Sequence, residues 1–129
     1  MPTKGSTAAV WAGRIMGGVP SLFLLVDGFM KLVKPAVVVE TTVRLGYPET
    51  VITGLGIVLL TATVLYLVPA TSVLGAILLT GYLGGAVATH VRVGAGLFEV
   101  LFPVIVGALL WGGLFFRDRR VRELIPLRA

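Results

Sequence analysis

A few charged or ionisable side chains in an otherwise apolar chain are the residues that could do chemistry. They are Asp27, Lys31, His90, Arg92 and Glu99, called the polar cluster below. A carboxylate inside an apolar segment is costly unless it is paired, protonated or hydrated. Lys31 follows Asp27 by one helical turn, in the order that favours an ion pair. The imidazole of His90 can exchange protons near neutral pH.

Three interpretations of the polar cluster are open. In the first, Asp27 pairs with Lys31 or Arg92 and Glu99 pairs with the remaining base, which locks the helix ends together. In the second, the cluster forms a polar mouth above an apolar cavity, where His90 or Lys31 hydrogen-bonds a lipophilic ligand. In the third, His90 and two carboxylates hold a metal, but no ligand spacing supports this. We therefore assign no metal site and no catalytic residue.

Four apolar stretches must position these residues, at about 12–33, 50–68, 72–91 and 97–116. Each has the length of about 20 residues that an α-helix needs to cross a bilayer. Hydrophobic residues make up 57% of the chain, charged residues 13%, and the mean hydropathy is +1.00. Such values are unlike those of water-soluble domains. The sequence therefore predicts an all-α, polytopic membrane protein, with one domain over 1–129 forming an antiparallel four-helix bundle.

Basic residues are divided unequally between the two ends of this bundle. One end would carry Lys4, Arg14, Arg117, Arg119, Arg120, Arg122 and Arg128, and the other Lys31, Lys34, Arg44 and Arg92. Cytoplasmic segments carry the excess of Lys and Arg. The sequence thus predicts cytoplasmic termini for a multi-pass protein of the bacterial inner (plasma) membrane. In the basic tail, 117–129, we expect Arg117, Arg119, Arg120 and Arg122 to contact anionic lipid headgroups.

The segment 36–45 joins the first two spans on the predicted external side. Its apolar residues alternate with period two, as in a strand, but a strand here would have no partner. Pro35 favours a helix start, Glu40 and Arg44 are spaced as a helical ion pair, and Gly46 favours a helix stop. We predict a short amphipathic helix on the external surface.

Small residues recur at four-residue spacing in the third span, where Gly81, Gly84, Gly85 and Ala88 lie. Such residues let membrane helices approach closely. We expect them to pack the third span centrally against its neighbours. A seam between two copies and room for a flat lipophilic ligand are the alternatives. Tyr82 lies among them, and its hydroxyl needs a partner, either on another helix or on a ligand.

Several classes of function are excluded by composition. The chain has no cysteine, so it cannot perform thiol chemistry or hold a metal with thiolates. It has no Walker, HExxH, GxSxG or Rossmann motif. The net charge of +5 comes largely from the tail beside a membrane helix, so lipid rather than nucleic acid is the expected partner. We expect no independent catalytic activity.

Several runs resemble the DoxX-like family of small four-helix membrane proteins. They are DGFMKL at 27–32, RLGYPE at 44–49, YLVP at 66–69 and LGAILLTGYLGGAVATHVR at 74–92, with Phe102-Pro103, Trp111 and the basic tail. The resemblance covers almost the whole chain, and the run at 74–92 is the most specific part. It implies a four-helix transmembrane fold, and it is more informative about fold than about activity.

Relatives in that family include the small membrane subunit of a thiosulfate:quinone oxidoreductase, a component of a mycobacterial membrane oxidoreductase complex, and maturation factors for amine dehydrogenase. Some carry a glutamate in the second span, where this chain has GLGIVLL at 54–60 and no acid. The resemblance implies an accessory membrane protein that binds a quinone or lipid and supports a redox-enzyme partner, with a homo-oligomer also open. The alternatives are a scaffold or assembly factor with a purely structural polar cluster, and a small-solute or proton transporter.

Overall fold

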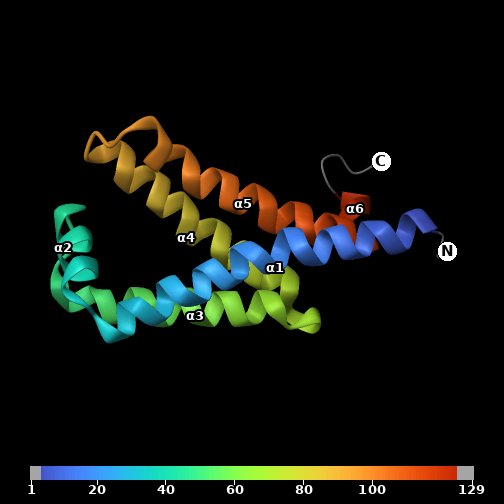
Figure 1. Cartoon of the computed structure of the whole chain (residues 1–129), viewed down its shortest axis with the longest axis horizontal. Helices are drawn as coiled ribbons and strands as arrows, with labels where there is room; N and C mark the ends of the chain where they lie inside the picture. Colours follow the sequence, from blue (N-terminus) through green and yellow to red (C-terminus); the bar gives the residue numbers. More distant parts are fainter. Residues whose placement is uncertain (1–3, 125–129) are drawn as a thin grey trace.

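The structure is a computed structural model that describes residues 4–124, with side chains from Thr7 onward, so the end of the predicted tail, 125–129, lies outside the described residues. All regular structure in this part of the chain is helical (Figure 1). The elements are α1 (Lys4–Val33), α2 (Ala36–Arg44), η1 (Glu49–Val51), α3 (Ile52–Leu67), η2 (Pro69–Thr71), α4 (Ser72–Arg92), α5 (Leu97–Arg117) and α6 (Arg119–Leu124).

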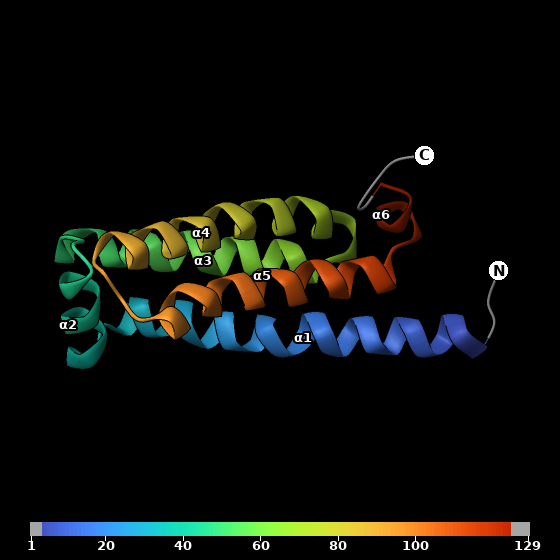
Figure 2. The same cartoon turned by 90° about the horizontal axis from the view of Figure 1, so that it is seen from above.

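Four helical segments are long and apolar enough to cross a membrane, which confirms the predicted all-α class and its four spans. The segments are Thr7–Val33 in α1, Glu49–Leu67 over η1 and α3, Pro69–Arg92 over η2 and α4, and Leu97–Arg117, which is α5. They form a ring in which α1 and α4 each pack against both α3 and α5. Figures 1 and 2 show the beginning of α1 and α6 at one end of the bundle and α2 at the other. The expectation that the third span is central is wrong, because α4 has no more large neighbours than the other three helices.

Glycines allow close helix contacts on both sides of α1, and Gly75 allows another between α4 and α3. On one side, a Cβ at Gly113 of α5 would lie 2.6 Å from the backbone nitrogen of Gly17 and 2.8 Å from the carbonyl oxygen of Gly13. On the other side, a Cβ at Gly56 of α3 would lie 3.0 Å from the carbonyl oxygen of Gly28. In lipid, where apolar burial gives helices little drive to associate, such close approach supplies dispersion contacts. These glycines therefore fix how α1 packs.

The small residues toward the C-terminal end of α4 have the opposite environment. A Cβ added at Gly81, Gly84 or Gly85 would meet nothing within 4 Å, and Ala88 is exposed. The prediction that these residues pack α4 against its neighbours is therefore wrong for this chain alone. Small residues four apart permit another helix to approach closely, but no helix of this chain lies beside them.

Helix α2 forms where the short helix was predicted, directly after Pro35, and the alternative of a strand is wrong. It ends before Gly46, whose φ of +101° lies in the left-handed region that glycine tolerates. The ion pair expected between Glu40 and Arg44 does not form among the described residues. Whether α2 lies on the external surface stays a prediction.

Arg117 is directed into the bundle at the end that holds the termini. Its Nε donates to the carbonyl oxygen of Gly113 at 3.1 Å, and its guanidinium lies 5.1 Å from the ring centre of the fully buried Tyr66. Tyr66 in turn donates to the carbonyl oxygen of Leu110. The Nη2 of Arg117 is buried without a hydrogen-bond partner among the described residues. Because Nη2 is buried, the prediction that Arg117 contacts a lipid headgroup is wrong for this atom.

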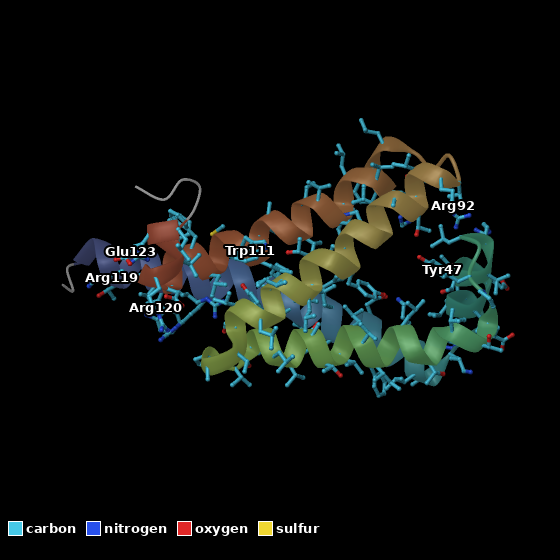
Figure 3. The ribbon with its side chains drawn as sticks, turned by 180° about the vertical axis from the view of Figure 1, so that it is seen from behind. Tyr47, Arg92, Trp111, Arg119, Arg120 and Glu123 are labelled. Carbon is cyan, nitrogen blue, oxygen red and sulfur yellow. The ribbon has the colours of Figure 1, made fainter. Side chains whose placement is uncertain are left out.

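The other tail arginines within the described residues lie on α6 at the same end, and Figure 3 labels two of them, Arg119 and Arg120. The side chains of Arg119 and Arg120 are 76% and 90% exposed, and each lies within 4 Å of a carboxylate, that of Glu123 or Asp118. Arg122 donates to carbonyl oxygens near the end of α5. Exposed pairs of this kind contribute little stability, so an anionic headgroup can readily replace the carboxylate beside Arg119 or Arg120. Their contact with lipid stays a prediction.

Candidate functional site

A cavity of about 440 Å³ lies in the half of the bundle near α2. Figure 3 shows α3 and α4 close together near η2 and separated toward α2, with Tyr47 of the connector after α2 and Arg92 at the end of α4 both at the open end. Helices α1, α2, α4 and α5 supply most of the wall, and α3 contributes Leu55. Much of the wall is apolar, formed by Phe23, Leu24, Leu55, Leu83, Phe102 and Val106.

The glycines of α4 explain part of this empty volume. Gly81 and Gly85 both line the cavity, and neither has another group close to the position of its absent Cβ. Gly84 also faces open space but does not line the cavity. The sequence left open that glycines of the third span make room for a ligand. The structure is compatible with this for Gly81 and Gly85, and not for Gly84.

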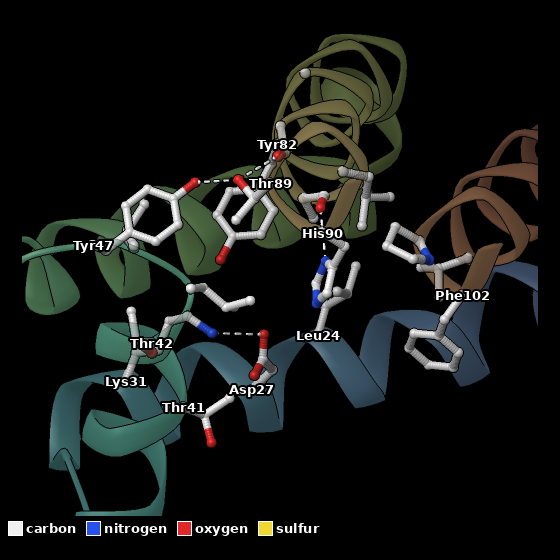
Figure 4. A pocket seen from close by; sticks show the side chains of 18 of the residues that line it. Leu24, Asp27, Lys31, Thr41, Thr42, Tyr47, Tyr82, Thr89, His90 and Phe102 are labelled. Carbon is white, nitrogen blue, oxygen red and sulfur yellow. Dashed lines mark hydrogen bonds and ion pairs between the residues drawn. The ribbon is translucent and has the colours of Figure 1, made fainter. Parts of the chain in front are cut away.

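Asp27 and Lys31 form an ion pair on the α1 wall of the cavity. The distance from Asp27 Oδ2 to Lys31 Nζ is 3.0 Å, and the side chains are 38% and 13% exposed (Figure 4). This is one of the two pairings that the sequence allowed for Asp27. Because the two charges cancel, the pair gives the wall polarity without net charge.

Tyr82 and His90 are two of the polar groups that α4 brings to the cavity, and both side chains project into it in Figure 4. The His90 Nδ1 lies 2.7 Å from the carbonyl oxygen of Ala86. A carbonyl oxygen can only accept, so Nδ1 carries the hydrogen and Nε2 of the neutral ring carries a lone pair. Within residues 4–124, neither Nε2 nor the Tyr82 hydroxyl has a hydrogen-bond partner. The interhelical hydrogen bond expected for Tyr82 is therefore absent.

The cavity is also lined by four residues with hydroxyl groups that the sequence analysis did not single out: Thr41, Thr42, Tyr47 and Thr89. The hydroxyls of Tyr47 and Thr89 lie 2.7 Å apart and join the connector after α2 to α4 (Figure 4). Tyr47 stands in the RLGYPE run and Thr89 beside His90, so a signal was present for both. No local pattern indicated that Thr41 and Thr42 would line a cavity, because this depends on where α2 lies against the other helices.

Arg92 and Glu99 lie outside the cavity. Arg92 donates from Nη2 to the carbonyl oxygen of Leu45 at 2.9 Å, which ties the connector to the end of α4. Glu99 is exposed in the first turn of α5 and forms no ion pair within the described residues. That part of the chain also contains no group of three or more residues able to hold a metal. The structure thus brings Asp27, Lys31 and His90 together with Tyr82, and separates the other two members of the polar cluster.

Four apolar helices around a cavity with a partly polar wall define a small polytopic membrane protein with a cavity between its helices. A family model described as the DoxX-like family matches residues 15–113, and the chain belongs to that family. Comparison with curated proteins and with solved structures finds no match. The family gives the fold and leaves the activity to be argued from the cavity.

Proposed function

We propose that this protein binds one lipophilic molecule, a quinone or a lipid, in the cavity between α1, α2, α4 and α5. The observation that carries the proposal is the Tyr82 hydroxyl, which faces an apolar-walled cavity without a partner among the described residues. Polar groups removed from water are almost always hydrogen-bonded, and an unmet one costs about 1–3 kcal/mol. A ligand oxygen would supply the missing partner.

The dimensions of the cavity support this proposal. A volume of about 440 Å³ is within the range of small-molecule sites. Phe23 contacts Phe102 edge to face, with ring centres 5.3 Å apart, and both line the cavity. Phe23 is also 47% exposed on the outer surface of the bundle, so the cavity borders the surface that would face lipid. A polar head could therefore occupy the cavity while an apolar tail extends into the bilayer.

We propose an accessory role for this binding, in support of a redox partner in the bacterial inner membrane, as the family resemblance implies. The absence of cysteine is in keeping with a protein that holds a lipophilic molecule and leaves electron transfer to its partner. The basic residues gathered around α6 support cytoplasmic termini. Association with a second copy of the chain belongs to the same proposal.

This orientation can be tested with single cysteines, because the chain contains none. Glu49→Cys, at the α2 end, should react with a membrane-impermeant maleimide on intact cells. Arg119→Cys, at the other end, should react only after lysis. The reverse pattern would place the termini outside.

A scaffold or assembly factor is the second candidate function. Two observations favour it: Asp27 is already paired with Lys31, and Gly84 and Ala88 present an open small-residue face one turn apart on α4. In this case the polar cluster stabilises the bundle and the open face receives a partner helix. The two functions differ in whether a small molecule accompanies the protein.

The experiment that separates them is native mass spectrometry of the protein in mild detergent, followed by organic extraction. We expect one apolar molecule per chain in the wild type and reduced occupancy in Tyr82→Phe, which removes only the hydroxyl. Thr61→Ala, an exposed position of α3 outside the cavity, is the control and should keep the ligand. Protein that carries only bulk phospholipid, with no defined stoichiometry, would refute ligand binding and favour the scaffold.

A further inference from the structure

We infer that, among the lipophilic molecules proposed above, the cavity selects those that donate hydrogen bonds, such as the reduced hydroquinone or a lipid with a free hydroxyl, over those that only accept them, such as the oxidised quinone, an ether or an ester lipid. The inference rests on the proposed function, because it concerns which molecule occupies that cavity. It follows from where the polar hydrogens of the cavity wall are already committed.

The threonine hydroxyls of the wall have no hydrogen left to give. Thr41, Thr42 and Thr89 each donate to the carbonyl oxygen four residues earlier in their own helix, at 2.8 Å in each case. A hydroxyl has one hydrogen, so each of these groups can offer a ligand only the lone pairs of its oxygen.

The same reasoning assigns the hydrogens of Tyr47 and His90. Because the hydrogen of Thr89 is committed to its own helix, Tyr47 must be the donor in the 2.7 Å pair between the two hydroxyls. His90 donates its Nδ1 hydrogen to the carbonyl oxygen of Ala86, which leaves Nε2 of the neutral ring as an acceptor facing the cavity. Tyr47 and His90 therefore also present acceptors.

The ion pair adds a further acceptor. Asp27 Oδ2 receives Lys31 Nζ at 3.0 Å, and Oδ1 has no partner within the described residues. The remaining donors are the Tyr82 hydroxyl and the other ammonium hydrogens of Lys31, whose side chain is only 13% exposed. The wall thus offers more acceptors than donors.

This imbalance discriminates between ligands. A hydroxyl can give its hydrogen to His90 Nε2 or Asp27 Oδ1 and still accept from Tyr82. A carbonyl or ether oxygen can accept a hydrogen bond only from Tyr82 or Lys31. Placed beside His90 Nε2, such an oxygen forms no hydrogen bond, because both atoms present lone pairs. Sites built to hydrogen-bond a ligand hydroxyl reject analogues that lack it, because the buried acceptor is then left unpaired.

The test compares two probes with the same apolar body, farnesol and farnesyl methyl ether, binding to the full chain in phospholipid nanodiscs. Dissociation constants are measured by titration and corrected for the partition of each probe into protein-free nanodiscs. We expect farnesol to bind about tenfold more tightly than the ether, which corresponds to about 1.4 kcal/mol. In His90→Phe the ratio should fall toward one, whereas His90→Gln, whose side-chain oxygen can accept, should keep part of it.

Each outcome decides between the two proposals. Saturable binding of both probes with equal constants, or tighter binding of the ether, overturns the preference for donors and leaves ligand binding intact. A preference that is unchanged in His90→Phe overturns the assignment to His90. Saturable binding of neither probe to the wild type refutes the proposed function, and the inference with it. The wild-type comparison holds even where a His90 variant fails to fold.

Discussion

Filling the cavity from α4 should strongly weaken ligand binding without weakening the fold. Gly84 and Gly85 are adjacent, and a Cβ at either would meet nothing within 4 Å, but only Gly85 lines the cavity. Gly85→Leu would place its side chain where the ligand lies, whereas Gly84→Leu would direct the same side chain elsewhere. The two substitutions therefore form a matched pair on one turn of one helix.

The magnitude follows from the apolar contact that the ligand loses. A leucine side chain occupies the space of about four ligand carbons, each worth about 0.8 kcal/mol when buried, so binding should weaken by about 3 kcal/mol. This corresponds to an affinity loss of roughly a hundredfold. Replacing glycine in a helix also gains up to about 1 kcal/mol of helix propensity in either variant. Neither protein should unfold at a lower temperature than the wild type.

The assay is ligand occupancy by native mass spectrometry beside thermal unfolding in the same detergent. We expect Gly85→Leu to be empty and Gly84→Leu to be occupied, with similar unfolding temperatures. Equal occupancy of the two variants would refute the placement of the ligand against Gly85. Loss of ligand in Gly84→Leu alone would move the binding surface to the outer face of α4.

Two other substitutions test what holds the bundle together, each by thermal or denaturant unfolding in detergent. Asp27→Asn should destabilise the fold by about 2 kcal/mol because it leaves the little-exposed Lys31 ammonium without a counter-ion, and adding Lys31→Met should recover most of the loss; an unchanged stability would show that the pair contributes nothing. Gly75→Ala should be more harmful, because its Cβ would lie 2.2 Å from the backbone nitrogen of Tyr66, whereas Gly54→Ala, in open space on α3, should be neutral or stabilising. Equal effects of the two alanines would contradict the close contact between α3 and α4.

The elements and the ion pair of α1 were predictable because they depend on neighbours in sequence. The length of each apolar run sets a span, and the breaks around Pro35 and Gly46 set the ends of α2. Asp27 and Lys31 lie one turn apart on one helix, so their contact needs no knowledge of the tertiary fold.

The features that sequence reasoning missed depend on what stands across from a residue. Small residues at four-residue spacing fit a helix contact, a dimer seam or a cavity equally well, and for Gly81 and Gly85 the structure shows a cavity. Arg117 was expected in the headgroup region because it begins a basic run. It turns inward because Gly13 and Gly17 of α1 leave room for its side chain. These glycines precede Arg117 by about a hundred residues, so no local pattern around Arg117 could indicate this contact.

The glycines of the bundle have two environments, either in close contact with another helix or beside open space. Where α1 meets α5, glycine allows backbone contact, and the nearby tyrosine, Tyr66, is fully buried and donates to a carbonyl oxygen. Where α4 faces α1 across the cavity, glycine leaves space, and Tyr82 has a hydroxyl without a partner among the described residues. A membrane provides no water to satisfy that hydroxyl at depth. The buried Arg117 Nη2, where α1 meets α5, also lacks a partner among the described residues, but the glycines beside it allow helix contact and do not leave space. Beside Tyr82 an unmet hydrogen bond and empty volume occur together, which is what a binding site requires.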